Sequence, residues 1–255
     1  MDENRFTFVV PMFDASKTLA RMLHSVCGQS YSNWKIILID DVSNKEEIAA
    51  CKKILSNFNL IDNSYLEKIK VIWNTEKKWE VANVLSGIKL CDDNDIICRL
   101  DADDCLSDLD ALSFLNQVYK QSNFKAIWTA HRWNVTDRNI SGPMPENADP
   151  YKFAWVSSHL KSFRKSLLNN VPFENFTNMN GEIVKRAGDR AIYLPCLHKA
   201  GKLRGFLPRV FYHYHINEKG GTVYQTEDAK FQKQEADFIS ARGYISSGES
   251  WEQKI

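Results

Sequence analysis

Two short runs of aspartates carry the strongest chemical signal in this sequence. Asp40 and Asp41 follow the apolar run 35–39, and the run 101–104 follows the apolar run 96–100. Neighbouring carboxylates repel one another, so such runs indicate a hard divalent cation or the hydrogen-bond donors of a ligand. One acidic loop is weak evidence because Asp is common in turns, but two at neighbouring strand ends indicate a binding site.

These carboxylates are positioned by alternating strand-like and helix-like segments in the first 105 residues. Short apolar runs predict strands at 6–11, 35–39, 70–73 and 96–100. Apolar residues at helical spacing predict helices at 19–26, 48–58 and 81–88. This order predicts parallel strands joined by crossover helices, which is a Rossmann-like α/β sheet. Ligands of such sheets bind at the carboxyl ends of the strands, where both aspartate runs fall.

The second half has a looser pattern. Helical spacing predicts helices that begin near Ser107 and that cover 156–168, 185–199 and 228–242. Apolar runs predict strands at 126–130 and 210–215. Residues 131–150 contain three prolines and are expected to form a loop.

Composition bounds the class of protein. A chain of 255 residues with 44% hydrophobic residues can bury the core of one large domain. Its apolar stretches are too short to span a bilayer, its N-terminus lacks a signal-peptide core, and its six cysteines form no C-x-x-C pair. We therefore expect a soluble, cytoplasmic protein without a disulfide framework or a cysteine zinc site.

A net charge of +1 conceals an asymmetry along the chain. Residues 1–110 carry 19 acidic and 13 basic side chains, whereas residues 111–255 carry 13 acidic and 20 basic ones. The excess in the second half is either ordinary solvated surface or a face for an anionic partner.

The sequence has no glycine-rich loop of the kind that holds phosphates. Neither G-x-G-x-x-G after the first strand nor G-x-x-x-x-G-K-[ST] is present. A diphosphate would then be held through a divalent metal on Asp103 or Asp104, which would stabilise a departing nucleotide diphosphate as a Lewis acid.

Three of these segments resemble the family 2 glycosyltransferases. Residues 9–14 (VVPMFD) are similar to the family's V-I-P-x-Y-N, and residues 39–43 (IDDVS) are similar to V-D-D-G-S with Val42 in place of Gly. Residues 100–104 (LDADD) match L-D-A-D-D, which contains the D-x-D metal motif. The resemblance runs from about residue 6 to residue 215 and is strongest in the first half.

The resemblance implies a GT-A fold, with a mostly parallel central sheet flanked by helices and a smaller C-terminal acceptor-side region. Residues 1–105 would be the nucleotide-sugar-binding half. Residues 106–255 would be the acceptor-binding half with its C-terminal helix, within one continuous domain. The implied activity is metal-dependent, inverting transfer of a sugar from a nucleotide-diphosphate sugar, a UDP-sugar above all, with Mn²⁺ or Mg²⁺.

Site residues follow from the resemblance position by position. The nucleotide-sugar site would comprise Pro11, Phe13, Asp14, Asp40, Asp41 and Asp101. The family's N-x-G-x-x-x-A-R-N segment corresponds here to residues 74–83, which lack its Gly and Arg, so Lys77 or Lys78 would replace the arginine. The metal would be held by Asp103, Asp104 and His215. His213 would point to the same face as His215, and cross-strand packing is the other interpretation of this pair.

The second half is expected to supply the base and the acceptor wall. Inverting transfer needs a carboxylate that deprotonates the acceptor hydroxyl, and Asp189 in a G-D pair at a helix start resembles that base. The alternatives are a helix-capping role for Asp189 and Glu182 as the base. His159 and Arg164 resemble the acceptor-side wall, and surface positions on a helix are the other interpretation.

The sequence leaves more than one acceptor and more than one class of protein open. Most small members of the family build bacterial surface glycans. The basic second half also suits glucosyl or arabinosyl transfer to 5-hydroxymethylcytosine in phage DNA, in the host cytoplasm. A nucleotidyltransferase also uses paired acids on a Rossmann-like sheet, and a nucleotide-binding module without catalysis is a third class.

Overall fold

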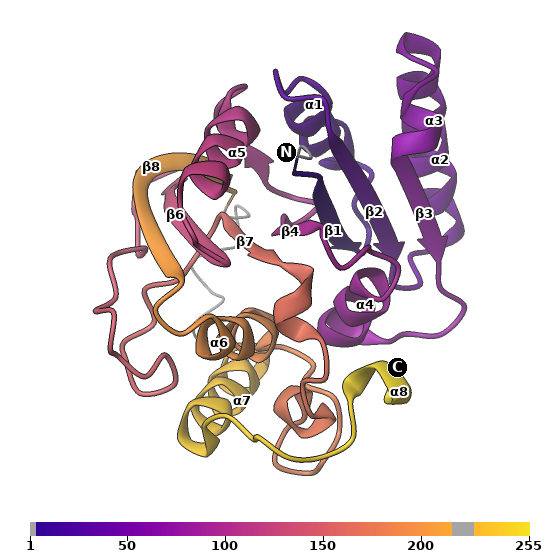
Figure 1. Ribbon diagram of the computed structural model, residues 1–255. Coiled ribbons are helices and arrows are strands. Elements are labelled where there is room, and N and C mark those ends of the chain that lie inside the picture. Colours follow the sequence, from indigo (N-terminus) through magenta and orange to yellow (C-terminus); the bar gives the residue numbers. More distant parts are fainter. Residues whose placement is uncertain (1–3, 216–226) are drawn as a thin grey trace.

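The computed structural model describes residues 4–215 and 227–255. Eight strands form one sheet in the order β3-β2-β1-β4-β7-β6-β8-β5 (Figure 1). The first four in chain order are β1 (Phe6–Met12), β2 (Trp34–Asp40), β3 (Ile69–Trp73) and β4 (Ile96–Arg99). They pair in parallel with one another, and helices lead from each to the next. These helices are α1 (Leu19–Cys27), α2 (Lys45–Ile61), α3 (Tyr65–Lys68) and α4 (Trp79–Ile88).

The fold class predicted from the sequence is confirmed. All four strands expected in the first half are present, each within two residues of its expected bounds. β1 and β2 are buried on both faces, as parallel strands covered by helices must be. The buried stripe of α1 consists of the apolar residues at helical spacing, which are Leu19, Met22, Leu23 and Val26.

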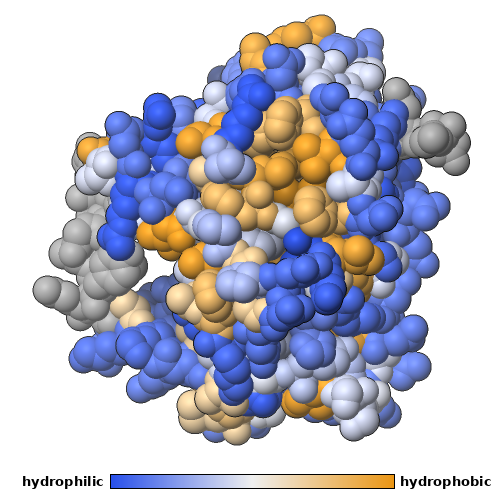
Figure 2. Space-filling model, turned by 60° about the vertical axis from the view of Figure 1, so that its left-hand side comes forward, coloured by the Kyte–Doolittle hydropathy of each residue, from blue (hydrophilic) through white to orange (hydrophobic). Residues whose placement is uncertain are grey.

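The second half makes the sheet mixed, where a mostly parallel sheet was expected. It adds β5 (Cys105–Leu106), β6 (Ala126–Trp133), β7 (Lys161–Arg164) and β8 (Arg204–Tyr214). β7 pairs antiparallel with both β4 and β6, β8 pairs parallel with β6, and β5 pairs antiparallel with β8. In β8 only Arg204, Phe211 and Tyr212 are buried. Figure 2 brings this side of the molecule forward and shows hydrophobic surface there, bordered by hydrophilic residues.

The helix expected at 156–168 is wrong. Residues 161–164 form β7, and a 3-10 turn, η1 (Lys165–Leu168), follows. The apolar residues Leu160, Phe163 and Leu167 have helical spacing, but β7 fills the gap between β4 and β6 and gains backbone hydrogen bonds on both edges. Tertiary pairing therefore overrides local periodicity.

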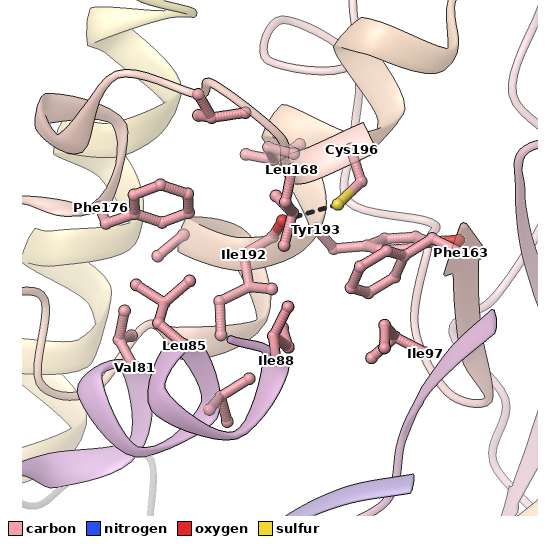
Figure 3. Close-up of a cluster of buried hydrophobic side chains, with 14 of the residues drawn as sticks. Val81, Leu85, Ile88, Ile97, Phe163, Leu168, Phe176, Ile192, Tyr193 and Cys196 are labelled. Atoms are coloured by element: carbon pink, nitrogen blue, oxygen red, sulfur yellow. Dashed lines mark hydrogen bonds between the residues drawn. The ribbon is translucent and has the colours of Figure 1, made fainter. Parts of the chain in front are cut away.

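The remaining helices are α5 (Ala111–Gln121), α6 (Gly188–Ala200), α7 (Glu227–Arg242) and α8 (Trp251–Lys254), together with the 3-10 turn η2 (Phe173–Phe176). One core cluster joins the sheet to α1, α2 and α5, and a second joins its other face to α4, α6 and α8. Figure 3 shows the second cluster, where Val81, Leu85 and Ile88 of α4 face Ile192 of α6. Across the described residues, no helix is long and apolar enough to cross a bilayer.

Candidate active site

A cavity of about 700 Å³ opens at the carboxyl ends of β1, β2 and β4. The residues expected from the sequence that line it are Pro11, Phe13, Asp14, Asp41, Lys77, Asp101 and Asp103. Those that sequence reasoning missed include Lys17, Trp79, Glu80, Asn83, Lys185, Arg186 and Gln232. The strand order explains the convergence, because β1 lies between β2 and β4 and all three end at the same edge.

Asp40 supports the cavity from beneath rather than lining it. Its buried carboxylate accepts hydrogen bonds from the backbone N–H of Ser43 at 3.0 Å and from the Ser43 hydroxyl at 2.5 Å. The Ser43 oxygen in turn accepts the backbone N–H of Asp14 at 2.8 Å. Asp40 thereby connects the loop after β2 to the loop after β1.

Asp41 connects the same loop to the start of α4. Its two carboxylate oxygens accept the backbone N–H groups of Lys78 at 2.7 Å and Trp79 at 3.1 Å. The Lys77 ammonium lies 3.8 Å from the ring centroid of Phe13 and 5.1 Å from that of Trp79, within cation–π range. Lys77 thus lines the cavity, whereas Lys78 contributes its backbone to the support beneath it.

The backbone around the cavity is strained. Asp14, Val42 and Trp79 have φ values of 48°, 67° and 66°, in the left-handed region. Val42 stands where the family motif has Gly, and a β-branched residue is poorly suited to this conformation. Such strain concentrates at functional sites when the surroundings enforce it.

Arg99 is a buried cation beside the cavity, and its side chain is 3% exposed. Its guanidinium donates to Glu80 Oε1 at 2.9 Å, to Asp101 Oδ1 at 3.4 Å and to the carbonyl of Val9 at 2.8 Å. Burial outweighs this cation and raises the pKa of Glu80 to about 7 and that of Asp101 to about 6. The sequence signal that could have identified this buried cation is a single arginine, Arg99, inside the apolar run 96–100.

Asp104 and His215 form the candidate metal side. The buried Asp104 carboxylate accepts the Tyr212 hydroxyl at 2.6 Å and the backbone N–H of His215 at 2.6 Å. Burial, together with Asp101 and Asp103, raises the pKa of Asp104 to about 8. Within the described ranges, no three His, Cys, Asp or Glu side chains are grouped closely enough to form a metal cage.

The donors on this side still suit a hard cation. His215 Nδ1 is buried without a hydrogen-bond partner, 3.9 Å from Asp104 Oδ1. Asp103 is exposed at the cavity, and each oxygen of Asp104 keeps a free electron pair. The ring of His213 lies 6.4 Å from that of His215.

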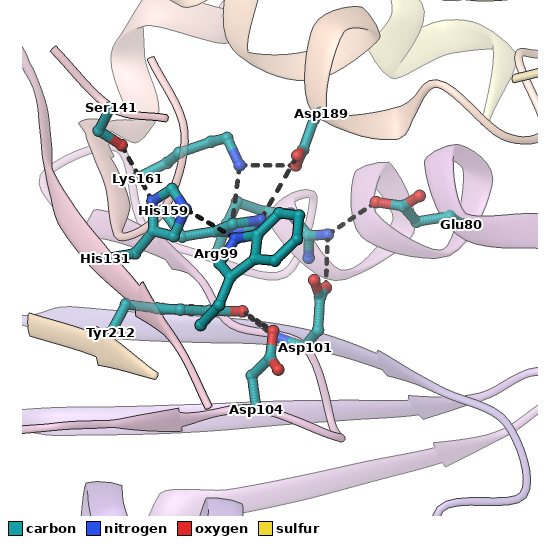
Figure 4. Close-up of polar contacts among 11 residues, drawn as sticks. Glu80, Arg99, Asp101, Asp104, His131, Ser141, His159, Lys161, Asp189 and Tyr212 are labelled. Carbon is teal, nitrogen blue, oxygen red and sulfur yellow. Dashed lines mark hydrogen bonds and ion pairs between the residues drawn. The ribbon is translucent and has the colours of Figure 1, made fainter. Parts of the chain in front are cut away.

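A second polar cluster is centred on Asp189, the second residue of α6 (Figure 4). Lys161 Nζ lies 2.7 Å from Asp189 Oδ1, and His159 Nε2 lies 3.6 Å from Oδ2. Burial by itself would raise the pKa of Asp189, but Lys161 and His159 outweigh it and hold that pKa below its usual range. The structure thus brings His159 to Asp189 from a buried segment before β7, not from a helix surface.

Two other expected residues lie elsewhere. Arg164 pairs with Ile96 at the amino end of β4, opposite the cavity, and packs on Tyr119 at 5.3 Å from the ring centroid. Glu182 is exposed and forms an ion pair with Lys185 at 3.2 Å.

Comparison with known sequences identifies the family. The sequence model of the family described as glycosyl transferase family 2 matches residues 7–173 of this chain. The putative glycosyltransferase EpsE of Bacillus subtilis (strain 168) is 29% identical over 120 residues, which are 47% of this chain and 38% of EpsE. The glycosyltransferase GlyG of Streptococcus pneumoniae serotype 4 is 24% identical over 193 residues, which are 68% of this chain and 61% of GlyG. The matched part thus covers less than two thirds of either relative.

Solved structures agree on the fold. The mannosyltransferase PcManGT from Pyrobaculum calidifontis, in complex with GDP-Man and Mn²⁺, superposes with a TM-score of 0.61 over 92% of this chain and 64% of its own, at 14% identity. S. aureus TarS 1-349 in complex with UDP-GlcNAc gives a TM-score of 0.60 over 84% of this chain and 59% of its own, also at 14% identity. The fold and the site define a GT-A protein. The chain belongs to glycosyl transferase family 2.

Proposed function

We propose that this protein is a metal-dependent, inverting glycosyltransferase that moves a sugar from a nucleotide-diphosphate sugar to an acceptor hydroxyl. The observation that carries this proposal is the meeting of three motif loops at one cavity, with Phe13, Asp41 and Asp101 among its lining residues. The family membership supports it. It also argues against a nucleotidyltransferase, and a binding module would have no use for a base at Asp189.

The donor is proposed to be a UDP-sugar. One structural relative was solved with UDP-GlcNAc and another with GDP-Man, so proteins of this fold bind nucleotide-diphosphate sugars. Phe13 and Trp79 present aromatic faces for a base, and Lys77 lies between them for a phosphate. Residues 1–105 supply most of this donor side, and residues 106–255 are proposed to supply the acceptor side.

Asp103, Asp104 and His215 are the proposed holders of Mn²⁺ or Mg²⁺. When bound, the cation would neutralise the diphosphate as it departs. Two of the similar structures were solved with Mn²⁺. The carboxylates of Asp103 and Asp104 would orient the donor. Arg99 forms ion pairs with Glu80 and Asp101 and so reduces their repulsion of the donor's diphosphate.

Asp189 is the proposed base. As the oxygen of the acceptor hydroxyl forms a bond to the anomeric carbon, the proton of that hydroxyl passes to a carboxylate oxygen of Asp189. The bond between the sugar and the diphosphate breaks on the opposite side, and its electron pair leaves with the nucleotide. The configuration at the anomeric carbon is therefore inverted.

The acceptor is proposed to be a surface glycan. Lys185 and Arg186 at the cavity favour an anionic acceptor as the second candidate, and hydroxymethylated phage DNA is one. Retention on such DNA at low salt, lost as salt rises, would favour the second candidate over the first. The six free cysteines fit a reducing cytoplasm, which we propose as the location.

Nucleotide binding tests the donor site. Thermal unfolding is measured with UDP, GDP, CDP and TDP, each with Mn²⁺, Mg²⁺ or EDTA. We expect UDP with Mn²⁺ to raise the midpoint, since a ligand that binds only the folded state stabilises it by mass action. Asp103→Asn should abolish the metal-dependent part of the shift, and Asp137→Asn at an exposed loop should not. No shift with any nucleotide would refute the proposed donor site.

A further inference from the structure

Lys161 is a lysine with no exposed side-chain surface. It begins β7, where it is paired with Arg99 of β4 and with Trp128 of β6. Buried lysines are rare unless they are paired. Its ammonium lies 2.7 Å from Asp189 Oδ1 and 3.2 Å from His159 Nδ1, so a single buried group contacts both neighbours.

These contacts fix the state of His159. An ammonium can only donate hydrogen bonds, so His159 Nδ1 is the acceptor and Nε2 carries the proton. The Nε2–H group then faces Asp189 Oδ2 at 3.6 Å. Burial and the charge of Lys161 hold the pKa of His159 well below its usual range, which keeps the ring neutral.

Aromatic rings fix the orientation of His159. It stacks on Tyr212 at 4.5 Å and 17° and on Tyr214 at 5.5 Å and 27°. His131 presents its edge to the same ring at 6.1 Å and 84°. His131 itself bonds to the Ser141 hydroxyl at 3.2 Å, so its ring is also held in place (Figure 4).

Asp189 is the exposed end of this cluster. Its side chain is 34% exposed, compared with 8% for His159 and none for Lys161. The preceding residue, Gly188, lies against the carboxyl group of Glu80, which lines the cavity. The cluster therefore exposes the Asp189 carboxylate beside the proposed donor site, while Lys161 and His159, which contact that carboxylate, are buried.

We propose that Lys161 and His159 are positioning residues for Asp189, fixing its two carboxylate oxygens so that a free electron pair faces the acceptor hydroxyl. This inference rests on the proposed role of Asp189 as the base. It assigns a function to two buried polar residues that structural support alone does not require, because apolar side chains fill such positions at lower cost.

Several charged groups act on Asp189 from the elements around it. Lys161 and His159 come from β7 and the segment before it, Arg99 from β4, and Asp101 and Glu80 from the cavity wall. Arg190 is its neighbour on α6, and His131 lies behind His159. Without Lys161, Asp189 would face two carboxylates and would lose the cation that contacts it directly, with Arg99 and Arg190 as the remaining positive charges, so its pKa would rise.

The pH dependence of the reaction tests the proposal. UDP release from UDP-glucose and UDP-GlcNAc is measured from pH 5 to pH 9 for the wild type, Lys161→Met and Lys161→Arg. The wild type should show no loss from Asp189 on the acid side of this range. In Lys161→Met an acid limb should enter the range, with about a tenfold loss for each pH unit below the new pKa. Lys161→Arg should restore most of the wild-type profile.

A second variant avoids removing the buried charge. His159→Phe keeps an aromatic ring stacked on Tyr212 and Tyr214 but removes the Nε2–H group. This variant should lower kcat several-fold and leave KM for the donor unchanged. Its loss in kcat should be smaller than the roughly 10²–10⁴-fold loss expected for Asp189→Asn.

The outcomes separate the two proposals. If wild-type protein neither binds a nucleotide nor releases UDP, the proposed function fails, and the titration of Asp189 followed by ¹³C NMR decides the role of Lys161. An Asp189 pKa that is the same in wild type and Lys161→Met overturns the positioning role. So does an active, folded Lys161→Met whose rate falls by one constant factor at every pH.

Discussion

At the scale of the residue, adjacent side chains in one motif have different tasks. Asp40 is buried and orders the loop through Ser43, whereas Asp41 lines the cavity and accepts two backbone N–H groups. Asp103 is exposed at the cavity, whereas Asp104 is buried against Tyr212. A motif read from the sequence gives the chemistry of the group but not which member faces the ligand.

The same limit explains what sequence reasoning missed. Carboxylate runs are conspicuous because several charges stand together after an apolar segment. Arg99 and Lys161 are single charges within segments that are otherwise buried, and their partners come from other parts of the chain. Arg164 was assigned to the acceptor wall by resemblance, but strand pairing directs it to the opposite end of the sheet.

Val42 offers a test of strain at the residue scale. Its φ of 67° costs a side-chain-bearing residue about 1–2 kcal/mol, and Gly adopts this conformation freely. Val42→Gly should therefore raise the free energy of unfolding by about 1 kcal/mol, which is about 2–4 °C in Tm. Val135→Gly, at an exposed turn without positive φ, is the matched control and should not stabilise the protein. A lower Tm for Val42→Gly would show that the loop is not strained.

At the scale of the element, the first half of the sheet was predictable and the second was not. β1, β2 and β4 are buried apolar runs that alternate with helices, so the local pattern agrees with the parallel pairing of β1 with both β2 and β4. β7 is placed by β4 and β6, whose paired residues lie about 30 to 70 positions earlier, and its own periodicity is ambiguous.

Helix α7 shows how an element supports a site that it barely touches. Its buried Glu235 accepts the backbone N–H groups of Lys185 at 3.2 Å and Arg186 at 2.8 Å. Those two residues line the cavity, and Gln232 of the same helix joins them there. A polar-faced helix far along the chain thereby fixes the segment that leads into α6 and Asp189.

The contact of α4 with the sheet gives a prediction at this scale. A Cβ at Gly87 would lie 2.6 Å from Val9 Cγ1 and 2.8 Å from Ile39 Cδ1. Gly87→Ala should lower the free energy of unfolding by about 1–3 kcal/mol, because overpacking exceeds the gain in helix propensity. Gly142→Ala is the control, since the nearest atom to its Cβ would be 4.0 Å away. Urea unfolding compares the two, and an equal effect at both sites would contradict the close packing of α4.

At the scale of the whole molecule, the fold brings side chains of the acidic half and of the basic half of the chain together at one cavity. Asp14, Asp41 and Asp101 come from the first 105 residues, and Lys185 and Arg186 come from the second half. A net charge of +1 is therefore compatible with strong local fields of both signs. Such an arrangement suits a ligand that combines an anionic diphosphate with hydroxyl groups.

The stability of the whole molecule should depend on pH through its buried histidines. Burial lowers the pKa of His131 to about 4, compared with 6.5 for an exposed imidazole. Between these values the unfolded chain binds more protons than the folded one, so stability is lost as pH falls below about 6.5. Glu80, whose pKa is raised to about 7, acts in the opposite direction, so the wild-type curve contains both effects.

A variant isolates the histidine contribution. The free energy of unfolding is measured by urea denaturation from pH 4 to pH 8 for wild type and His131→Gln. The difference between them should grow by up to about 1.4 kcal/mol per pH unit as pH rises from 4 to 6.5, and should be constant above pH 7. A His131→Gln difference that is constant across the range would show that His131 titrates alike in the folded and unfolded chain. It would also mean that the cluster behind Asp189 is open to protons, contrary to the burial of its rings.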